Sequence, residues 1–295
     1  KTLLIRSNQQ GSCVWQLYIK DRLADAITHE EAEALPAQGG EIIYSDPRSP
    51  ASRITARLAK FGDTTLTDTI LGTPFRYACE GFFQVNIPVY EQALRDIQEW
   101  VSYPKHTILA GNNFNRKNPS VIDLYAGVGT IGLTIGGDDV TLIEINEFAV
   151  AEMQRNITAL GRVNARAILA PSEKALDFIA PNHIIIVDPP RAGLHADVVA
   201  RLLEVMPPRI IYLSCNPITQ ARDIALLAKE YSIHAHQGYN FFPRTPHIEH
   251  LVVLDRNRKN HTISSKPDRA NRYKRLLRQQ FNQCCCLSLC RANQA

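Results

Sequence analysis

The sequence lacks the long apolar segment that a membrane-spanning helix needs. No apolar run approaches the roughly 18 residues of a membrane span. The first residues, Lys1 to Arg6, contain too short an apolar stretch for a signal peptide. We therefore expect a cytoplasmic protein with no membrane partner. Position 1 is not Met, which suggests a fragment of a longer chain, and no internal repeat is found.

The chain also lacks a cysteine pattern typical of disulfides or of zinc. Its seven cysteines are an odd number in a chain that looks cytosolic, so they do not describe a disulfide framework. Four of them lie near the C-terminus, at Cys284, Cys285, Cys286 and Cys290, without zinc-finger spacing and without a neighbouring His. We expect an unstructured tail there and no metal site.

Composition and charge are those of a globular protein with an unusual C-terminal end. The chain is 45% hydrophobic and 21% charged, which argues against wholesale disorder. The net charge is +4, but residues 256–295 contain ten Lys or Arg and one Asp, a net of +9, which leaves −5 for residues 1–255. A basic tail on an acidic body fits either a nucleic-acid contact or a solvated, disordered segment.

The first part of the chain, residues 1–103, is predicted to be a smaller β-rich subdomain ending in a helix. Apolar alternation predicts strands at 14–19 and 41–44 and around 66–70. Helices are expected over 25–35, ended by Pro36, and over 88–100. Residues 104–120 are rich in Asn, Lys and Pro, and are interpreted as a loop at the domain boundary.

From residue 121 to residue 255 strands and helices alternate, which predicts an α/β domain with a mostly parallel sheet covered on both faces. The predicted strands are Val121–Tyr125, Val140–Ile145, Ala165–Leu169, His183–Val187 and Ile210–Ser214. The predicted helices are Asn146–Leu160, Ala196–Met206 and Pro217–Glu230. Segments 232–239 and 249–255 have no helix between them and predict an antiparallel pair at the sheet edge. Residues 256–295 are interpreted as a basic, disordered tail.

Chemically reactive side chains follow the predicted strands, at the edge of the sheet where ligands bind in such folds. The sequence Gly127-x-Gly129-x-x-Gly132 fits a nucleotide-binding loop, and Glu144 at the end of the next strand is placed to bind ribose hydroxyls. This pattern predicts a cofactor that contains a nucleoside. By itself it does not separate a dinucleotide from S-adenosylmethionine.

Two further strand ends carry candidate reactive groups. Cys215 precedes a helix with Asn216 as its N-cap and Pro217 as its first residue. The positive end of that helix is expected to favour the thiolate and so a nucleophile, whereas the alternative is a buried apolar cysteine. Asp188 stands between an apolar strand and two prolines, and is either a functional carboxylate or part of a simple turn.

Two short segments complete the candidate site. Gln84 and Asn86 alternate with apolar residues and so share one face, where amides read a base edge or cap the next helix. Glu249 begins an apolar strand, and an exposed Glu there would be merely solvated. His247 and His250 are interpreted as surface or packing residues, because no third metal ligand accompanies them.

Together these motifs resemble the S-adenosylmethionine-dependent RNA uracil-C5 methyltransferases, which act on transfer and ribosomal RNA. The resemblance covers about residues 1–255 and rests on the order and spacing of five segments. These are Phe82-Phe83-Gln84-Val85-Asn86, Asp123-Leu124-Tyr125-Ala126-Gly127-Val128-Gly129-Thr130, Asp188-Pro189-Pro190-Arg191, Ser214-Cys215-Asn216-Pro217 and Phe242-Pro243-Arg244-Thr245-Pro246-His247-Ile248-Glu249. It implies a Rossmann-like methyltransferase domain with RNA as the partner and S-adenosylmethionine as the cofactor.

The resemblance also implies roles for individual residues. Cys215 would be the nucleophile that adds to carbon 6 of a uracil, and Glu249 the base that removes the proton of carbon 5. The cofactor site would consist of Gln84, Tyr125, Gly127, Gly129, Thr130, Glu144 and Asp188. Phe83, Asn86 and Arg191 would contact the RNA base. Many members carry an upstream RNA-binding barrel and an iron–sulfur cluster, and neither is visible in this sequence.

Two other classes of protein share part of this pattern. A nicotinamide-dependent oxidoreductase would use the same glycine loop and Glu144, but has no need of Asp188 or Cys215. A non-catalytic RNA-binding or RNA-folding protein would keep the fold and the basic tail. It would not need both Cys215 and Glu249, and both are present.

Overall fold

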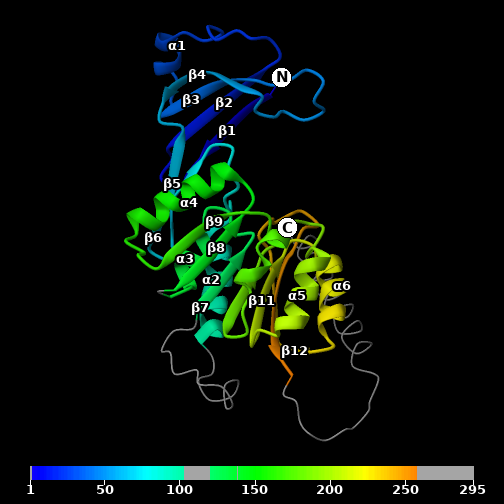
Figure 1. The fold of residues 1–295 in the computed structure, drawn as a ribbon. Helices are drawn as coiled ribbons and strands as arrows, with labels where there is room; N and C mark the ends of the chain where they lie inside the picture. Colours follow the sequence, from blue (N-terminus) through cyan, green and yellow to red (C-terminus); the bar gives the residue numbers. More distant parts are fainter. Residues whose placement is uncertain (1, 103–119, 138, 258–295) are drawn as a thin grey trace, which may run out of the picture.

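A computed structural model describes residues 2–102, 120–137 and 139–257. Figure 1 shows a small N-terminal lobe connected to a larger lobe that contains the main sheet. Within the described ranges no helix has the length and apolar character needed to cross a membrane. Most of the predicted loop 104–120, most of the predicted tail 256–295 and the C-terminal cysteines lie outside the described residues. Three residues of these ranges are described: Ser120 and Arg256 belong to strands of the main sheet, and Asn257 follows the last strand.

The N-terminal lobe is built on a four-stranded sheet, β1 (Thr2–Ser7), β2 (Cys13–Ile19), β3 (Gly39–Tyr44) and β4 (Ala56–Gly62), in that spatial order. Strands β2 and β3 are parallel and are connected through the short helix α1 (His29–Glu33). The predicted helix over 25–35 was therefore too long. Thr28 and Glu31 form a capping box that starts the helix at His29.

The hairpin β5 (Thr65–Ile70) and β6 (Thr73–Ala78) and the helix α2 (Ile87–Ser102) pack against the main sheet. Leu66, Phe75 and Ile97 share one apolar core with Val121 and Leu142 of that sheet. Residues 65–102 thus share an apolar core with the main sheet, on the other side of the predicted boundary near residue 103.

The main sheet has seven strands in the order β12-β13-β11-β10-β7-β8-β9. Their bounds are β7 (Ser120–Leu124), β8 (Val140–Glu144), β9 (Ala165–Leu169), β10 (His183–Val187), β11 (Arg209–Ser214), β12 (Tyr231–Tyr239) and β13 (Glu249–Arg256). The five strands β7 to β11 pair in parallel, while β13 runs antiparallel to both β11 and β12. The predicted α/β fold with an antiparallel pair at the edge is confirmed.

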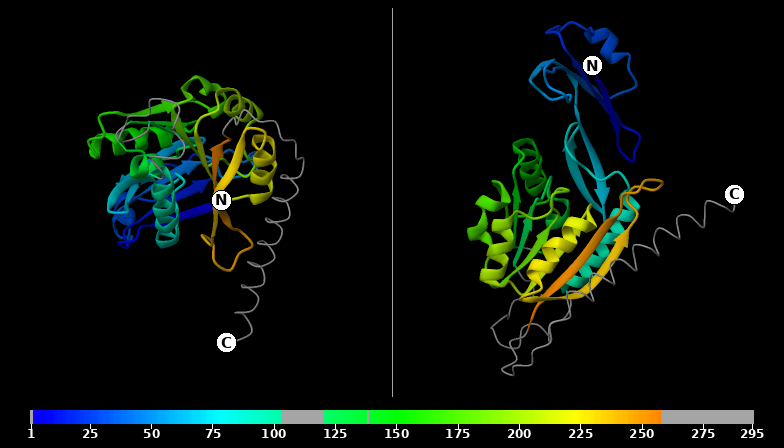
Figure 2. Two further views of the ribbon diagram at one scale, coloured as in Figure 1. Left: turned by 90° about the horizontal axis from the view of Figure 1, so that it is seen from below. Right: turned by 90° about the vertical axis from the view of Figure 1, so that its right-hand side faces the viewer.

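Helices cover both faces of this sheet (Figure 2). Alternate residues of β10 point to opposite sides: Ile184 and Ile186 join the core with α2, α3 (Thr130–Ile135) and α4 (Glu147–Ala159), while Ile185 and Val187 face α5 (Ala196–Val205) and α6 (Pro217–Leu227). Buried strands of this kind are apolar on both faces, which explains their near-continuous Ile and Val content. Helix α3, with glycine inside it, was not among the predicted helices.

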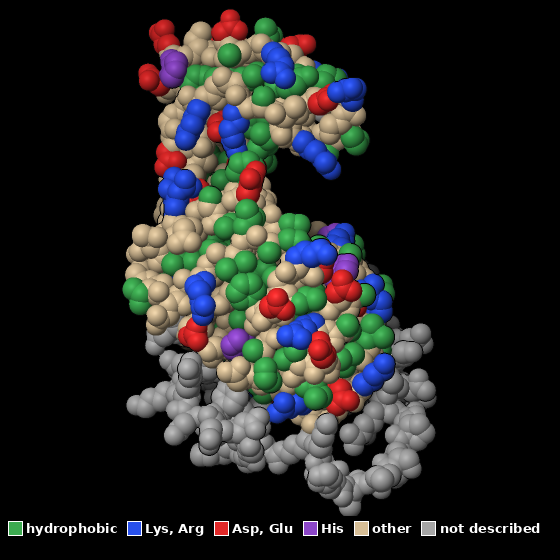
Figure 3. All heavy atoms as spheres, viewed as in Figure 1, with side chains coloured by type: hydrophobic (Ala, Val, Ile, Leu, Met, Phe, Trp, Pro, Cys, Tyr) green, Lys and Arg blue, Asp and Glu red, His purple; other side chains and the backbone are tan. Residues whose placement is uncertain are grey.

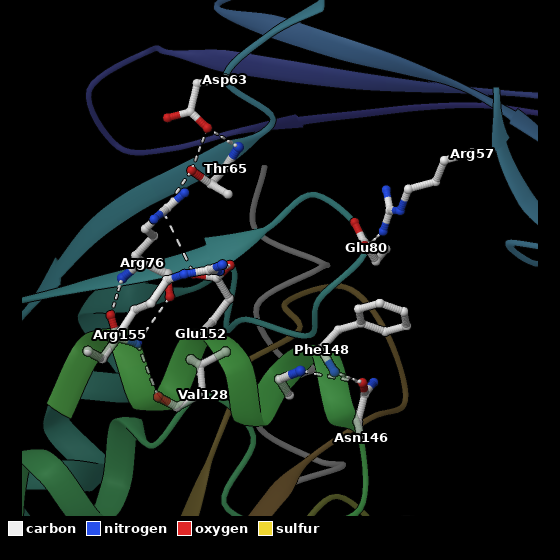
Figure 4. A network of polar contacts seen from close by, with 12 residues as sticks. Arg57, Asp63, Thr65, Arg76, Glu80, Val128, Asn146, Phe148, Glu152 and Arg155 are labelled. Atoms are coloured by element: carbon white, nitrogen blue, oxygen red, sulfur yellow. Dashed lines mark hydrogen bonds and ion pairs between the residues drawn. The ribbon is translucent and has the colours of Figure 1, made fainter. Parts of the chain in front are cut away.

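Helix α4 connects the hairpin β5–β6 to the glycine loop (Figure 4). The buried amide of Asn156 accepts a hydrogen bond from the backbone N–H of Arg76 at 2.9 Å and donates to its carbonyl at 3.1 Å, as a neighbouring strand would. The same amide also donates to the carbonyl of Val128 at 3.2 Å. Arg76 in turn lies 3.7 Å from the carboxylate of Glu152. These contacts hold the hairpin and the glycine loop to one helix.

Candidate active site

The carboxyl ends of β7, β8, β10 and β11 lie at the same edge of the sheet, because these strands are parallel and adjacent. Each end leads into one of the segments predicted to carry reactive side chains. The fold therefore brings Glu144, Asp188 and Cys215 to the same edge of the sheet, where open α/β folds have their ligand crevice, although positions 144 and 215 are 71 residues apart.

The glycine loop connects β7 to α3 in an unusual backbone conformation. Tyr125, Gly127 and Gly129 have φ of 65°, 57° and 89°. A Cβ at Gly129 would lie 3.0 Å from the side chain of Leu133, whereas a Cβ at Gly127 would meet no atom within 4 Å. Gly127 therefore faces open space, and its backbone is accessible to a ligand. The left-handed conformation of Tyr125 is costly for a residue with a side chain, as is common at binding sites.

Glu144 ends β8 and is fixed by backbone amides. One carboxylate oxygen accepts from the N–H of Gly127 at 3.0 Å and the other from the N–H of Asn146 at 2.8 Å. Among the described residues no Lys or Arg lies within ion-pair distance of Glu144. Its half-buried carboxylate thus retains lone pairs that can accept hydrogen bonds from a ligand.

Asp123 lies inside the sheet below the glycine loop. Its side chain is fully buried, and one oxygen accepts from the N–H of Gly132 at 2.8 Å. The other oxygen has no partner among the described residues. Burial raises the pKa of this carboxyl to about 8, with Asp188 and Glu144 adding to the shift. Asp123 belongs to the motif on which the resemblance rests, but sequence reasoning gave it no role.

Cys215, Asp188 and Glu249 interact electrostatically at the other side of the crevice. Burial raises the pKa of Asp188 to about 7, and burial together with Asp188 raises that of Glu249 to about 8. Glu249 is only 4% exposed, so it is not a solvated surface carboxylate. Burial, Glu249 and Asp188 also raise the pKa of the Cys215 thiol. In the free protein, desolvation and two acidic neighbours therefore oppose the thiolate that the helix dipole was expected to favour.

The local structure around Cys215 is otherwise as predicted. Asn216 caps α6 by accepting from the N–H of Ile218 at 3.2 Å, with Pro217 as the first helical residue. The Asn216 amide also donates to the carbonyl of Arg191 at 2.9 Å. Arg191 is exposed, bonds to Nδ1 of His247 at 2.9 Å, and lowers the pKa of both Cys215 and Glu249. The cationic side chain therefore lies near the reactive pair.

The segment that carries Gln84 is held by the N-terminal sheet. The guanidinium of Arg6 donates to the carbonyls of Cys79, Gly81 and Phe83. Phe83 is buried and stacks on Tyr77 with 4.1 Å between ring centroids. In this structure Phe83 is a core residue, so its ring is not accessible to a base. Its neighbour Phe82 is 70% exposed.

Asn86 is partly exposed and connects two segments of the chain. Its amide donates to the carbonyl of Phe241 at 3.2 Å, which links the start of α2 to the segment before Glu249. The expected base contact by Asn86 competes with this hydrogen bond.

Tyr90 is a residue that sequence reasoning missed. Its hydroxyl lies 2.8 Å from that of Thr130 at the start of α3, and its ring meets Phe241 edge-on with 5.8 Å between centroids. Asp188, Asp123 and Glu249 lie close enough to raise its pKa. Helical periodicity places Tyr90 on the apolar face of α2. The phenolic oxygen was the only signal that distinguished it from a packing residue.

A cavity of about 520 Å³ adjoins this crevice. Tyr125, Pro190 and His195 are in its lining, which also includes residues of α5 and α6. Glu144, Cys215 and Glu249 do not line it, so it lies beside the candidate site and does not contain it.

Comparison with known proteins shows which proteins this chain is similar to. Residues 173–257 match the tRNA (Uracil-5-)-methyltransferase family. An RNA methyltransferase of Lactiplantibacillus plantarum is 34% identical over 250 residues, which are 79% of this chain and 50% of that protein. Another, from Nitratidesulfovibrio vulgaris, is 30% identical over 79% of this chain and 47% of its own length. The chain thus spans about half the length of the curated relatives it matches.

Solved structures agree with the sequence matches. The tRNA (uracil-54, C5)-methyltransferase of Pyrococcus abyssi, solved with S-adenosyl-L-homocysteine, has a TM-score of 0.68 and 25% identity over 85% of this chain and 58% of its own. The tRNA m1G37 methyltransferase of M. jannaschii, at 17% identity and a TM-score of 0.51 over 83% of this chain and 70% of its own, shares the fold alone. The family match, the relatives and the shared fold confirm the resemblance of this chain to the RNA uracil-C5 methyltransferase family.

Proposed function

We propose that this chain transfers a methyl group from S-adenosylmethionine to carbon 5 of a uridine in RNA. The observation that carries the proposal is a thiol, Cys215, directly after β11, beside the start of β13 where the buried carboxyl Glu249 lies, at the same sheet edge as the glycine loop. A nucleophile and a base on separate strands fit covalent catalysis on a base that is itself a poor nucleophile.

The glycine-loop side of the crevice fits the methyl donor. Gly127 leaves open space for a ligand, and the anchored carboxylate of Glu144 accepts hydrogen bonds from a ribose diol. Thr130, bonded to Tyr90, lies at the start of α3, whose N-terminus Gly129 caps. Gln84, Tyr125 and Asp188 complete the proposed site. When bound, S-adenosylmethionine supplies an electrophilic methyl group on a positively charged sulfonium centre.

The proposed chemistry begins at Cys215. Its thiolate adds to carbon 6 of the uracil, which breaks the 5,6 double bond and makes carbon 5 nucleophilic as part of an enolate. After carbon 5 has gained the methyl group, Glu249 removes its proton, the double bond re-forms and Cys215 leaves as a thiolate. Arg191 near both groups opposes the raised pKa values that the free protein shows.

The charge state of the proposed site should change when the methyl donor binds. In the free protein burial raises the pKa of Asp188, Glu249 and Cys215; Asp188 also raises that of Glu249, and both carboxyls raise that of Cys215, so protonated forms are favoured. A sulfonium cation beside them lowers these pKa values by Coulombic attraction. The bound methyl donor is therefore expected to help create both the thiolate and the carboxylate that the reaction needs.

We propose structured RNA, either tRNA or rRNA, as the substrate. A uracil in folded RNA must be flipped out or presented by a loop to reach Cys215. The N-terminal lobe and the catalytic domain border a hollow with Lys and Arg side chains on its rims, which suits a polyanion (Figure 3). Phe82 is exposed in the segment that carries Gln84, and it offers an aromatic face to an unstacked base.

Mapping of 5-methyluridine in RNA from cells with and without the gene tests the proposal. Loss of the modification at a defined uridine, restored by the wild-type gene, is the expected result; an unchanged map contradicts it. Equilibrium binding of S-adenosylmethionine against NAD tests the oxidoreductase alternative. Binding of NAD but not of S-adenosylmethionine would favour that alternative.

A further inference from the structure

A buried amide lies directly behind the reactive pair. Gln220, in the first turns of α6, is 1% exposed. Its Nε2 donates to the carbonyl of Tyr212 in β11 at 2.8 Å and to the carbonyl of His250 in β13 at 2.9 Å. Its Oε1 lies 2.7 Å from Nδ1 of His250. One side chain thus bonds to both strands that lead to Cys215 and Glu249.

These contacts fix the protonation of His250. A carbonyl oxygen only accepts, so the two carbonyls bound to Gln220 require its NH₂ group on their side. Its oxygen therefore faces His250, and the Nδ1 of that imidazole must carry the hydrogen. Burial and the neighbouring His236 lower the pKa of His250 to about 4, which leaves the ring neutral near pH 7. The other ring nitrogen lies 3.5 Å from Nδ1 of His236.

The position of this cluster relates it to both reactive groups. Cys215 follows Ser214, which pairs with His250 across the antiparallel strands β11 and β13. Glu249 is the residue before His250, so its side chain points to the opposite face of the sheet. There it lies near Tyr90 of α2. Helix α6, whose N-terminus adjoins the thiol, is thus bonded to the strand that carries the carboxyl.

We propose that the Gln220–His250 hydrogen bonds form a positioning device that sets the distance between the Cys215 thiol and the Glu249 carboxyl. This proposal rests on the proposed function, which gives those two groups their roles. Apolar packing would hold α6 on the sheet but tolerate small slides along β13. Three directional hydrogen bonds between α6, β11 and β13 prevent such slides. Gln220 and His250 touch neither the RNA base nor the methyl donor in this account.

The two chemical steps should depend differently on this device. Addition to carbon 6 needs Cys215 and a bound uracil. Proton removal from carbon 5 needs Glu249 at the correct distance from a base already tethered to Cys215. A slide of α6 against β13 therefore slows resolution of the covalent adduct more than its formation, because a misplacement of about 1 Å costs up to about 10²-fold in rate.

The test compares three variants of the full chain by rapid quench with labelled RNA on denaturing gels. His250→Phe keeps a ring of similar size but removes the Nδ1 donor. His250→Asn places an amide N–H where Nδ1 stands, and should restore the bond to Gln220. His236→Phe is the matched control, because it removes only the 3.5 Å contact. We expect His250→Phe to accumulate the adduct and resolve it about ten- to a hundredfold more slowly, with unchanged affinity for S-adenosylmethionine, while the other two variants resolve it as wild type does.

Several results would overturn the proposal. One is an adduct that His250→Phe resolves at the wild-type rate; another is equal slowing in His250→Phe and His250→Asn, which would indicate packing alone. If His250→Phe does not fold, nitrogen-15 NMR of the wild-type imidazole decides: hydrogen on Nδ1 down to about pH 4 supports the device, and hydrogen on Nε2 contradicts it. Absence of any adduct in wild type would contradict the proposed function and not this device.

Discussion

The two sides of the crevice differ in how their acidic groups are held. On the glycine-loop side, Glu144 accepts two backbone N–H groups, at 3.0 Å from Gly127 and 2.8 Å from Asn146. On the side of β10, β11 and β13, the carboxyls of Asp188 and Glu249 have no ion-pair partner within the described residues. Their pKa values are raised to about 7 and about 8.

This difference indicates which part of the site is ready before ligands bind. Backbone amides orient Glu144 in the free protein, so the proposed ribose site needs no rearrangement of this carboxylate. On the reactive side burial raises the pKa of both carboxyls, and Asp188 adds to the shift of Glu249, so a cation bound beside them would favour their charged forms. The structure thus separates a preformed binding half from a reactive half that the methyl donor is expected to activate.

The largest effect is expected on the reactive side. Cys215→Ala should abolish methylation, because no covalent adduct can form, while affinity for S-adenosylmethionine stays near wild type. Glu249→Gln should allow addition and methyl transfer but slow proton removal by about 10²–10⁴-fold. A covalent protein–RNA species should therefore accumulate on a denaturing gel. Methylation that survives in Cys215→Ala would remove the nucleophile from the account. An inactive Glu249→Gln without trapped adduct would move the base elsewhere.

The binding half should respond at the level of affinity alone. Glu144→Ala removes the charged acceptor to which the ribose hydroxyls would donate. This should cost roughly 1.5–3 kcal/mol, or about ten- to a hundredfold in affinity for S-adenosylmethionine, measured by calorimetry. Glu147→Ala is the matched control, because Glu147 is an exposed residue in the first turn of α4. Equal affinities in Glu144→Ala and in the control would exclude Glu144 from the site.

The pH dependence of binding should distinguish a charged from an uncharged ligand. Asp188 has a pKa of about 7 in the free protein, and a sulfonium nearby lowers it. Binding then favours the deprotonated form, so affinity for S-adenosylmethionine should rise about tenfold from pH 6 to above pH 7, with protons released on binding. S-adenosylhomocysteine, whose sulfur is neutral, should show a much weaker rise. Calorimetry in buffers of different ionisation enthalpy counts the protons released on binding. Equal proton release, and an equal rise of affinity with pH, for the two ligands would refute this activation.

The smallest effect should come from Tyr90, which contacts both Thr130 beside the glycine loop and Phe241 before β13. Tyr90→Phe keeps the ring against Phe241 but loses the hydrogen bond to Thr130, worth about 0.5–1.5 kcal/mol. We expect a two- to about tenfold rise in the KM for S-adenosylmethionine, with kcat little changed. Tyr231→Phe is the control, because its buried hydroxyl bonds to the carbonyls of Leu202 and Pro207 away from the site. Similar kinetics for both variants would exclude Tyr90.

Much of the fold could be predicted from the sequence, because buried parallel strands are continuous apolar runs with helices of ordinary periodicity between them. The strand at His183–Val187 and the cap at Asn216 are examples. Helix α3 was missed because it has only six residues. The apolar cores could not be divided correctly, because the pairing of the β5–β6 hairpin with α4 depends on Asn156, far away in the sequence.

The candidate site could be predicted as a set of residues but not as an electrostatic environment. Motif positions name Cys215 and Glu249, and helix capping near Cys215 is local. The pKa of the thiol depends on two carboxyls that approach it only in the folded chain. The same holds for Gln220 and His250, whose mutual bond joins α6 to β13. Long-range proximity of this kind leaves no periodic signal in the sequence.

The most direct test of the central claim is trapping with RNA that contains 5-fluorouridine at the target position. Fluorine cannot leave carbon 5 as a cation, so the adduct cannot be resolved. We predict a covalent complex that requires S-adenosylmethionine for methyl transfer, carries the labelled methyl group, and maps by peptide mass spectrometry to Cys215. A complex attached to another residue, or full methylation activity on uridine RNA with no complex on the fluorinated RNA, would contradict the account.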